Sequence, residues 1–163
     1  MKAAILTLSD KGSRGERVDA SGPALSAWLA ERGVETVRTE IIPDEAELIT
    51  ARLVEWADSG AFDLILTTGG TGVSPRDVTP DATMKLLDRV IPGFGEVMRM
   101  KSLLKTPHAM ISRSVAGIRG QALIINLPGS PKGAIENLDA VWAAVPHAVE
   151  KIQGDTRDCA PSA

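Results

Sequence analysis

Hydrophobic residues gather in short runs along the chain, separated by longer amphipathic segments. The runs at residues 3–8, 62–67 and 121–127 are almost continuous, which is typical of strands buried on both faces of a sheet. Residues 35–42 alternate less regularly but are rich in β-branched side chains, so we expect a fourth strand there. The pattern therefore predicts four strands spread over most of the chain.

Segments with helical spacing of apolar residues lie between and after these strands. The expected helices cover residues 22–32, 44–59, 80–88, 93–105 and 131–151. In the fourth of these helices, we expect Val97, Met100 and Leu104 to face inward. Strands that alternate with helices predict an α/β protein with a parallel, doubly wound sheet.

Three local features remain between these elements. Asp44 is well placed as the N-cap of the second helix, with Glu47 three residues later as a capping box prefers. Residues 9–21 are polar and contain glycine, so we expect a long loop. Residues 109–119 are compatible with a hairpin or with an irregular crossing, because Gly117 interrupts them.

Ligands of doubly wound sheets bind at the carboxyl ends of the strands. The segments expected to leave strands at that edge are residues 9–10, 43–44, 69–77 and 128–130, and each contains Gly, Ser, Thr, Asp or Pro. Asp44 and Asp77 are distant in sequence but are predicted to lie on the same rim. This convergence favours a binding site there.

Composition narrows the class of protein. The chain has 163 residues, 44% of them hydrophobic and only 3% aromatic, which predicts one domain with an aliphatic core. We expect that domain over residues 1–153 and a polar tail over 154–163, where the single Cys159 cannot form an internal disulfide. A net charge of −3 argues against nucleic-acid binding. With no apolar run of about 20 residues and no signal-peptide pattern, we expect no membrane span and a cytoplasmic protein.

The loop at residues 67–72, Thr-Thr-Gly-Gly-Thr-Gly, is the strongest chemical motif. Glycines allow the backbone to approach a phosphate, and their free N–H groups supply donors for it. Neither the P-loop pattern nor Gly-x-Gly-x-x-Gly is present. A purely structural turn that needs positive φ is the alternative, but three glycines with neighbouring threonines favour a phosphate site.

Charged residues near this loop have two interpretations each. Asp77 could hold Mg²⁺ beside substrate phosphates, or it could accept hydrogen bonds from loop N–H groups. Local pattern makes Asp44 a helix cap, whereas its place on the rim favours a metal ligand. Arg113 could bind a phosphate with its guanidinium fork, or it could be a surface charge. His108 has no partner at metal-ligand spacing and is interpreted as structural.

Residues 68–72, followed by Arg-Asp-Val-Thr-Pro-Asp-Ala-Thr at 76–83, resemble the signature of the molybdopterin adenylyltransferases, the MogA/MoaB family that includes the G domain of gephyrin. The similarity extends from about residue 3 to residue 153. Further segments that resemble the family, in family order, are residues 8–10, 92–96, 112–113, 116–120 and 123–131.

This resemblance implies a three-layer α/β/α sandwich around a mostly parallel sheet, usually as a homotrimer. It implies Mg²⁺-dependent adenylylation of molybdopterin by ATP, with release of pyrophosphate and delivery of the product to a molybdenum-insertion enzyme. Asp44 and Asp77 match the family's essential aspartates, and Ser102 matches a serine linked to pterin binding. Other residues implied to line the site are Ser9, Thr68, Gly69, Gly70, Thr71, Gly72, Arg113, Pro128, Gly129 and Ser130.

Two other functions are compatible with the same domain. A non-catalytic trimer could bind or carry molybdopterin, as some MoaB-like proteins do. A nucleotide pyrophosphatase resembling the competence-damage-inducible proteins could hydrolyse a nucleotide without pterin. The intact Arg-Asp-Val-Thr-Pro-Asp pattern at residues 76–81 favours the transferase.

Overall fold

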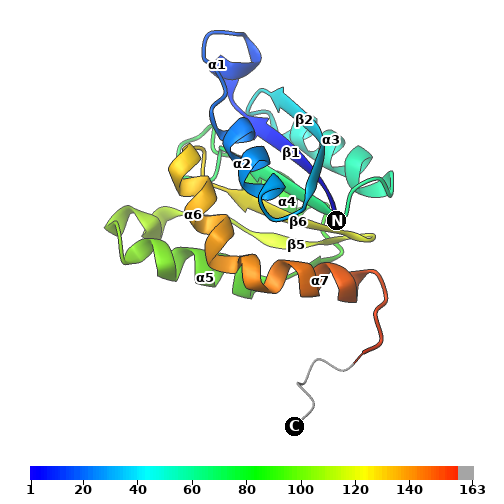
Figure 1. The fold of residues 1–163 in the computed structure, drawn as a ribbon. Helices are drawn as coiled ribbons and strands as arrows, with labels where there is room; N and C mark the ends of the chain where they lie inside the picture. The colour runs from blue at the N-terminus through cyan, green and yellow to red at the C-terminus, as the bar shows by residue number, and fades with distance from the viewer. Residues whose placement is uncertain (158–163) are drawn as a thin grey trace.

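In the computed structural model, which describes residues 1–157, a six-stranded sheet lies between two layers of helices (Figure 1). The strands follow the order β2-β1-β3-β6-β5-β4, and all neighbours are parallel except β4–β5 and β5–β6. Their bounds are β1 (Lys2–Leu8), β2 (Glu35–Ile42), β3 (Leu64–Thr68), β4 (Arg89–Val90), β5 (Ala116–Arg119) and β6 (Ala122–Leu127). The expected three-layer α/β/α sandwich with a mostly parallel sheet is confirmed.

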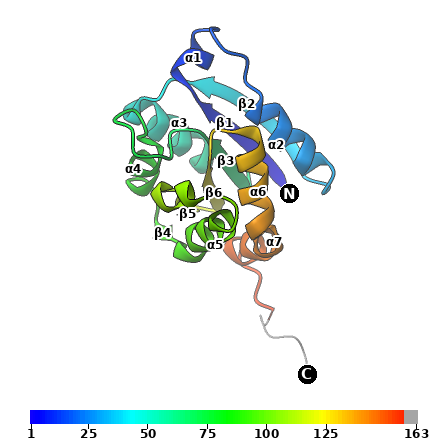
Figure 2. The same ribbon diagram turned by 90° about the vertical axis from the view of Figure 1, so that its left-hand side faces the viewer.

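Helices cover both faces of the sheet, as Figure 2 shows, with α3 and α4 on one face and α2, α5, α6 and α7 on the other. Their bounds are α1 (Asp10–Ser13), α2 (Ser21–Ala30), α3 (Ala46–Asp58), α4 (Thr79–Met84), α5 (Pro92–Leu103), α6 (Pro131–Val141) and α7 (Val145–Ile152), with 3-10 turns η1 (Pro107–Ile111) and η2 (Trp142–Ala144). Within residues 1–157, no helix is long and apolar enough to cross a bilayer.

The central strands are buried on both faces, which explains their continuous hydrophobic runs. Ile5 and Leu66 pack in the cluster beneath α2 and α6, whereas Leu6 and Ile65 pack in the cluster beneath α3. Successive residues of a strand alternate between the faces, so each strand supplies both clusters. All of these side chains are aliphatic, in agreement with the low aromatic content.

Two expectations near the first loop are corrected. Residues 9–21 are not wholly irregular, because α1 begins at Asp10. Asp44 is not a helix cap: α3 begins at Ala46, and Glu45 occupies the cap position without a side-chain hydrogen bond. Asp44 instead accepts a hydrogen bond from the backbone N–H of Asp10 with its Oδ2, at 3.0 Å. The Asp44 carboxylate therefore binds the distant N–H of Asp10 instead of an N–H group at the start of α3.

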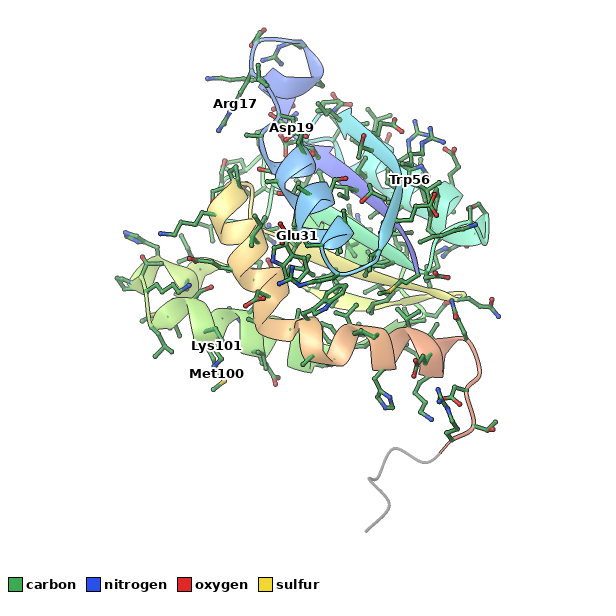
Figure 3. The ribbon with its side chains drawn as sticks, viewed as in Figure 1. Arg17, Asp19, Glu31, Trp56, Met100 and Lys101 are labelled. Atoms are coloured by element: carbon green, nitrogen blue, oxygen red, sulfur yellow. The ribbon has the colours of Figure 1, made fainter. Side chains whose placement is uncertain are left out.

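The inward face of α5 differs from the expected one. Phe94 and Met98 are buried, but Met100 is 67% exposed and Leu104 is 81% exposed, and Figure 3 shows Met100 pointing outward. Val97 is also exposed. Apolar side chains occupy more than one face of this helix, so periodicity alone does not identify the buried face.

Two further regions, residues 109–119 and 131–151, have element boundaries that the hydrophobic pattern did not define. Residues 109–119 contain the end of η1 and β5, and β5 forms a hairpin with β6 through Gly120, whose φ is 55°. The expected single helix over 131–151 is divided by η2. The division into a domain over 1–153 and a tail over 154–163 stays a prediction, and Cys159 lies outside the described residues.

A chain of buried hydrogen bonds runs from the centre of the sheet to the glycine loop. The Asn126 amide donates to the hydroxyls of Thr67 (2.9 Å) and Thr83 (3.0 Å). Thr83 donates to the carbonyl of Thr79 (2.8 Å), and Thr79 donates to the carbonyl of Gly69 (3.0 Å). Because these polar groups are buried in an aliphatic core, the chain fixes α4 and the loop against β6.

Replacing Asn126 with alanine should lower the free energy of unfolding by roughly 1–3 kcal/mol, because two buried hydroxyls lose their donor. Urea denaturation followed by circular dichroism measures this loss. Gln121→Ala, which removes an exposed amide from the turn before β6, should change stability by less than about 0.5 kcal/mol. Equal stability of the two variants would show that the chain of hydrogen bonds contributes little.

Candidate functional site

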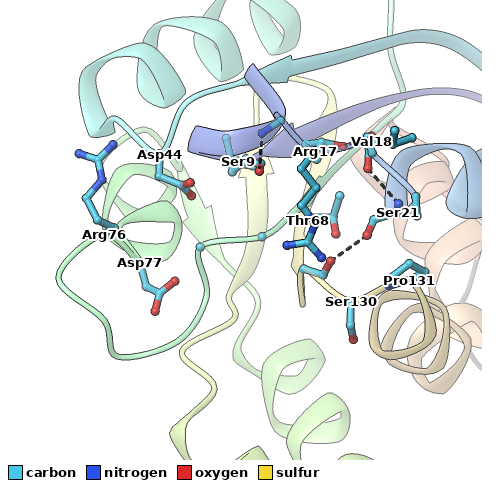
Figure 4. Close-up of a pocket in the computed structure, with 18 residues that line it drawn as sticks. Ser9, Arg17, Val18, Ser21, Asp44, Thr68, Arg76, Asp77, Ser130 and Pro131 are labelled. Carbon is cyan, nitrogen blue, oxygen red and sulfur yellow. Dashed lines mark hydrogen bonds between the residues drawn. The ribbon is translucent and has the colours of Figure 1, made fainter. Parts of the chain in front are cut away.

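A cavity of about 420 Å³ opens at the carboxyl edge of the sheet (Figure 4). Its walls include Ser9 after β1, Asp44 after β2, Gly70 after β3, and Gly129 with Ser130 after β6. The segments expected to leave the sheet at this edge thus meet at one cavity. Thr68, Gly69 and Asp77 also line it.

The glycine loop forms the floor of this cavity. Gly69 has a φ of 110° and Gly70 has a φ of 62°, values that other residues rarely adopt. A Cβ on Gly69 would lie 2.4 Å from the carbonyl oxygen of Leu8, and one on Gly70 would lie 2.4 Å from Oγ1 of Thr79. The backbone therefore requires glycine at both positions, as the alternative of a structural turn with positive φ predicted, and Gly70 is the partly exposed one of the two.

Asp44 takes part in a reciprocal pair with Asp10. The Asp10 N–H donates to Asp44, and the Asp44 N–H donates to Oδ1 of Asp10 at 3.1 Å. Arg76 donates to both oxygens of Asp10, at 2.6 and 3.0 Å. This guanidinium holds the pKa of Asp10 below its usual range. Burial raises the pKa of Asp44, and the nearby charge of Asp10 adds to that rise.

Asp77 faces the same cavity from the loop before α4. Its Oδ2 accepts a hydrogen bond from the N–H of Ser74 at 2.8 Å, so the capping role considered for it accounts for one oxygen. Its Oδ1 has no hydrogen-bond partner within residues 1–157. Figure 4 shows Asp44, Arg76 and Asp77 together on one side of the cavity.

The two carboxylates suit a divalent cation that is bound jointly with a phosphate. In the described part of the chain, no group of three or more His, Cys, Asp or Glu side chains is arranged to hold a metal. Mg²⁺ commonly takes only one or two carboxylates and completes its shell with water and substrate phosphates. The raised pKa of Asp44 also fits, because a cation would offset the charge of a partly desolvated carboxylate.

A second cavity of about 290 Å³ lies on the other side of the glycine loop. The Asn137 amide, buried on α6, donates to Oγ of Ser102 at 3.2 Å and to the carbonyl of Gly133 at 2.8 Å. Ser102 is therefore held in place rather than merely exposed. The expected site residues that line this cavity are Thr71, Gly72, Ser102, Pro128 and Ser130.

Arg113 lies beside the loop but lines neither cavity. It donates to the carbonyl of Gly72 at 2.7 Å and to both carboxylate oxygens of Asp81 at 2.8 and 3.0 Å. A further bond reaches the carbonyl of Asp77. These contacts tie the loop to α4, and a phosphate would have to compete with them for the guanidinium.

Several lining residues did not stand out in the sequence. Arg17, Asp19 and Ser21 line the first cavity, but they belong to a segment that was expected only to be a loop. Asn137 lines the second, together with His108, which was interpreted as structural but is exposed at this cavity. Asn137 had a detectable signal, since it is an amide on the otherwise apolar face of α6.

Residues 4–147 match the family described as "Probable molybdopterin binding domain". The chain belongs to this family. The molybdopterin adenylyltransferase of Helicobacter pylori J99 is 46% identical over 153 residues, which cover 93% of this chain and 87% of that protein. The enzyme of the same name from Escherichia coli K12 is 41% identical over 175 residues, covering 99% and 90% of the two chains.

Solved structures agree with this assignment. The molybdopterin biosynthesis enzyme MoaB of Thermus thermophilus is 52% identical, with a TM-score of 0.88, and the match covers 94% of this chain and 97% of that one. A MogA structure is 38% identical with the same TM-score of 0.88, covering 93% and 99%. The resemblance inferred from the motifs is thereby confirmed.

Asp44→Asn should be at least as stable as the wild type at pH 7. The fold raises the pKa of Asp44, so its ionised carboxylate opposes folding above that pKa, and a neutral amide removes the cost while still accepting from Asp10. The difference should vanish as the pH falls below the ordinary carboxyl value of 3.8, where Asp44 is protonated in both states. Thermal unfolding across this pH range tests it, and a marked loss of stability at pH 7 would contradict it.

Proposed function

We propose that this protein adenylylates molybdopterin with Mg²⁺-ATP and releases pyrophosphate. The observation that carries the proposal is a pair of adjoining cavities that share Ser130 and are separated by the glycine loop. A reaction that joins two substrates needs two binding sites that meet at one point. The names of the relatives, at 41% and 46% identity over nearly the whole chain, support this choice.

In this proposal the first cavity takes the polyphosphate of ATP. The N–H of Gly69 donates to the carbonyl of Leu127 at 3.1 Å, so the loop donor for a phosphate oxygen in this cavity is the N–H of Gly70. Asp44 and Asp77 would hold Mg²⁺ on the same side of the cavity. When bound, the cation neutralises charge on the phosphates and on the departing pyrophosphate.

The second cavity takes the pterin, with Ser102 as a hydrogen-bonding group that Asn137 holds in place. An oxygen of its terminal phosphate forms a bond to the α-phosphorus of ATP. The bond from that phosphorus to the bridging oxygen breaks, and its electron pair leaves with pyrophosphate. The attacking oxygen is already anionic, so positioning around Ser130 contributes more than a general base would.

The relatives' names favour this enzyme over the non-catalytic pterin carrier. No contact in the described residues specifically favours the pyrophosphatase. We place the protein in the cytoplasm, as its sequence indicates, with the adenylylated pterin passing to a molybdenum-insertion enzyme, as the family resemblance implies.

We also propose a homotrimer, as the resemblance implies. An apolar surface on α5 and η1, formed by Met100, Leu103, Leu104, Met110 and Ile111, supports self-association because all five side chains are exposed. Exposed apolar clusters of this kind often mark protein interfaces.

Asp77→Asn should reduce pterin-dependent pyrophosphate release by roughly a hundredfold or more, since it removes the negative charge that would hold Mg²⁺ against the phosphates. The amide still accepts from the N–H of Ser74, so the loop should keep its shape. Pyrophosphate release from Mg²⁺-ATP, with and without molybdopterin, measures the effect.

Asp81→Asn is the matched control, because Asp81 belongs to the same motif but pairs with Arg113 outside both cavities. It should retain most of the activity. Normal turnover by Asp77→Asn would refute the metal assignment. Pyrophosphate release that needs no pterin would refute the transferase itself.

Replacing Met100 and Leu104 together by glutamate should shift the protein to smaller oligomers, because charge would have to be buried at the α5 surface. Light scattering after size exclusion measures the mass. Val37→Glu places the same charge on an exposed apolar position of β2 and should leave the mass unchanged. An unchanged trimer in the double variant would exclude this surface as the interface.

A further inference from the structure

The loop between α1 and α2 forms part of the wall of the first cavity and carries an exposed arginine there. Arg17 and Val18 both line the cavity. Figure 4 shows the Arg17 side chain extending into it on the side of Ser21 and Ser130, away from Asp44. The cavity is therefore faced by carboxylates on one side and by a guanidinium on the other.

The position of Arg17 is set by anchors on both sides. The N–H of Glu16 donates to the carbonyl of Lys11 at 2.9 Å. The Asp19 carboxylate accepts from the hydroxyl of Thr7 at 2.8 Å and from the N–H of Ser21 at 2.9 Å. Only Arg17 and its neighbour span the gap between these anchors, so the short span keeps the backbone of Arg17 beside the cavity, within reach of its exposed side chain.

Arg17 also differs from the other arginines nearby in its pairing. Arg76 lines the same cavity, but Asp10 occupies its guanidinium. Arg14 pairs with Glu16 and does not line the cavity. Arg17 has neither a salt bridge nor a side-chain hydrogen bond within residues 1–157. It is thus a cation at a cavity wall without a partner from the described chain.

The neighbour of Arg17 also lies at the edge of the cavity. Val18 is apolar and 88% exposed, although it lies at the edge of a cavity with otherwise mostly polar walls. An unpaired guanidinium next to an exposed apolar side chain complements a nucleotide, which carries phosphates joined to a ribose and a flat base. A small inorganic anion would use only the first of these two features.

We infer that Arg17 binds a phosphate oxygen of ATP from the side opposite Asp44 and Asp77, which makes it a substrate-binding residue in addition to those carboxylates. The inference rests on the proposed function, because that function places ATP in this cavity. A guanidinium can donate two parallel hydrogen bonds to a phosphate, and a lysine cannot reproduce this fork. The polyphosphate would then lie between two positive groups, with Mg²⁺ held by Asp44 and Asp77 on one side and the guanidinium of Arg17 on the other.

The test compares the wild type with Arg17→Ala, Arg17→Lys and Arg14→Ala. Calorimetry gives the Kd for Mg²⁺-ATP, and pyrophosphate release gives KM for ATP and for molybdopterin. Arg17→Ala should raise the Kd and KM for ATP roughly tenfold to a hundredfold, as expected for a lost charge-assisted hydrogen bond. Arg17→Lys should recover part of this loss. The KM for molybdopterin should not change, and Arg14→Ala should match the wild type.

The outcomes separate this inference from the proposed function. ATP binding by Arg17→Ala as tight as by the wild type would overturn the inference, even if the wild type is an active transferase. A wild type that binds no ATP would overturn it as well. Arg17-dependent ATP binding without any pyrophosphate release would support the inference while refuting the transferase. Circular dichroism of Arg17→Ala confirms that a loss of binding does not reflect unfolding.

Discussion

The buried hydrogen bond between the Thr79 hydroxyl and the carbonyl of Gly69 is the contact on which the functional site most depends. It is the outer end of the chain that begins at Asn126 in the sheet. In the buried surroundings each of these hydrogen bonds would be costly to lose, so the chain holds the loop against the sheet, although Oδ1 of Asn126 itself has no partner in the described residues. Residues of this loop line both cavities. The hydrogen bonds that hold the loop against the core therefore also set the position of one cavity relative to the other.

Electrostatic arrangement at the rim explains how an acidic protein can suit a polyphosphate. Asp10 and Asp44 bind each other's backbone, and Arg76 donates hydrogen bonds to Asp10 but acts on Asp44 only through its charge. The remaining negative charge on Asp44 and Asp77 would repel phosphate unless a cation lies between them. In the proposed function, nucleotide and metal would therefore bind more tightly together than alone, because either one alone would meet uncompensated charge. Arg17, on the other wall, adds the donor that the carboxylate side lacks.

Much of the fold could be predicted from the sequence, because it depends on repeated patterns of hydrophobic residues and on the backbone sterics of single residues. Continuous aliphatic runs are typical of strands buried on both faces, and their alternation with helices predicts the parallel sheet. That topology, in turn, brings Asp44 and Asp77 to one edge although they are far apart in the chain. The positive φ of Gly69 and Gly70 likewise follows from a sharp turn that other residues cannot make.

The partners of individual side chains were decided only by tertiary structure. Asp44 has a favourable local position as a helix cap, yet a backbone N–H 34 residues away takes its carboxylate. Arg113 is occupied by the glycine loop and α4, and α5 buries a face that its periodicity did not select. Arg17 lies beside the cavity because hydrogen bonds of Glu16 and Asp19 hold the backbone on both sides of it. The sequence thus determined the layers, the loop and the acidic rim, since these depend on hydrophobicity and backbone sterics. Tertiary structure assigned the hydrogen-bond partners, because distant groups compete for each polar atom and only the folded geometry resolves that competition.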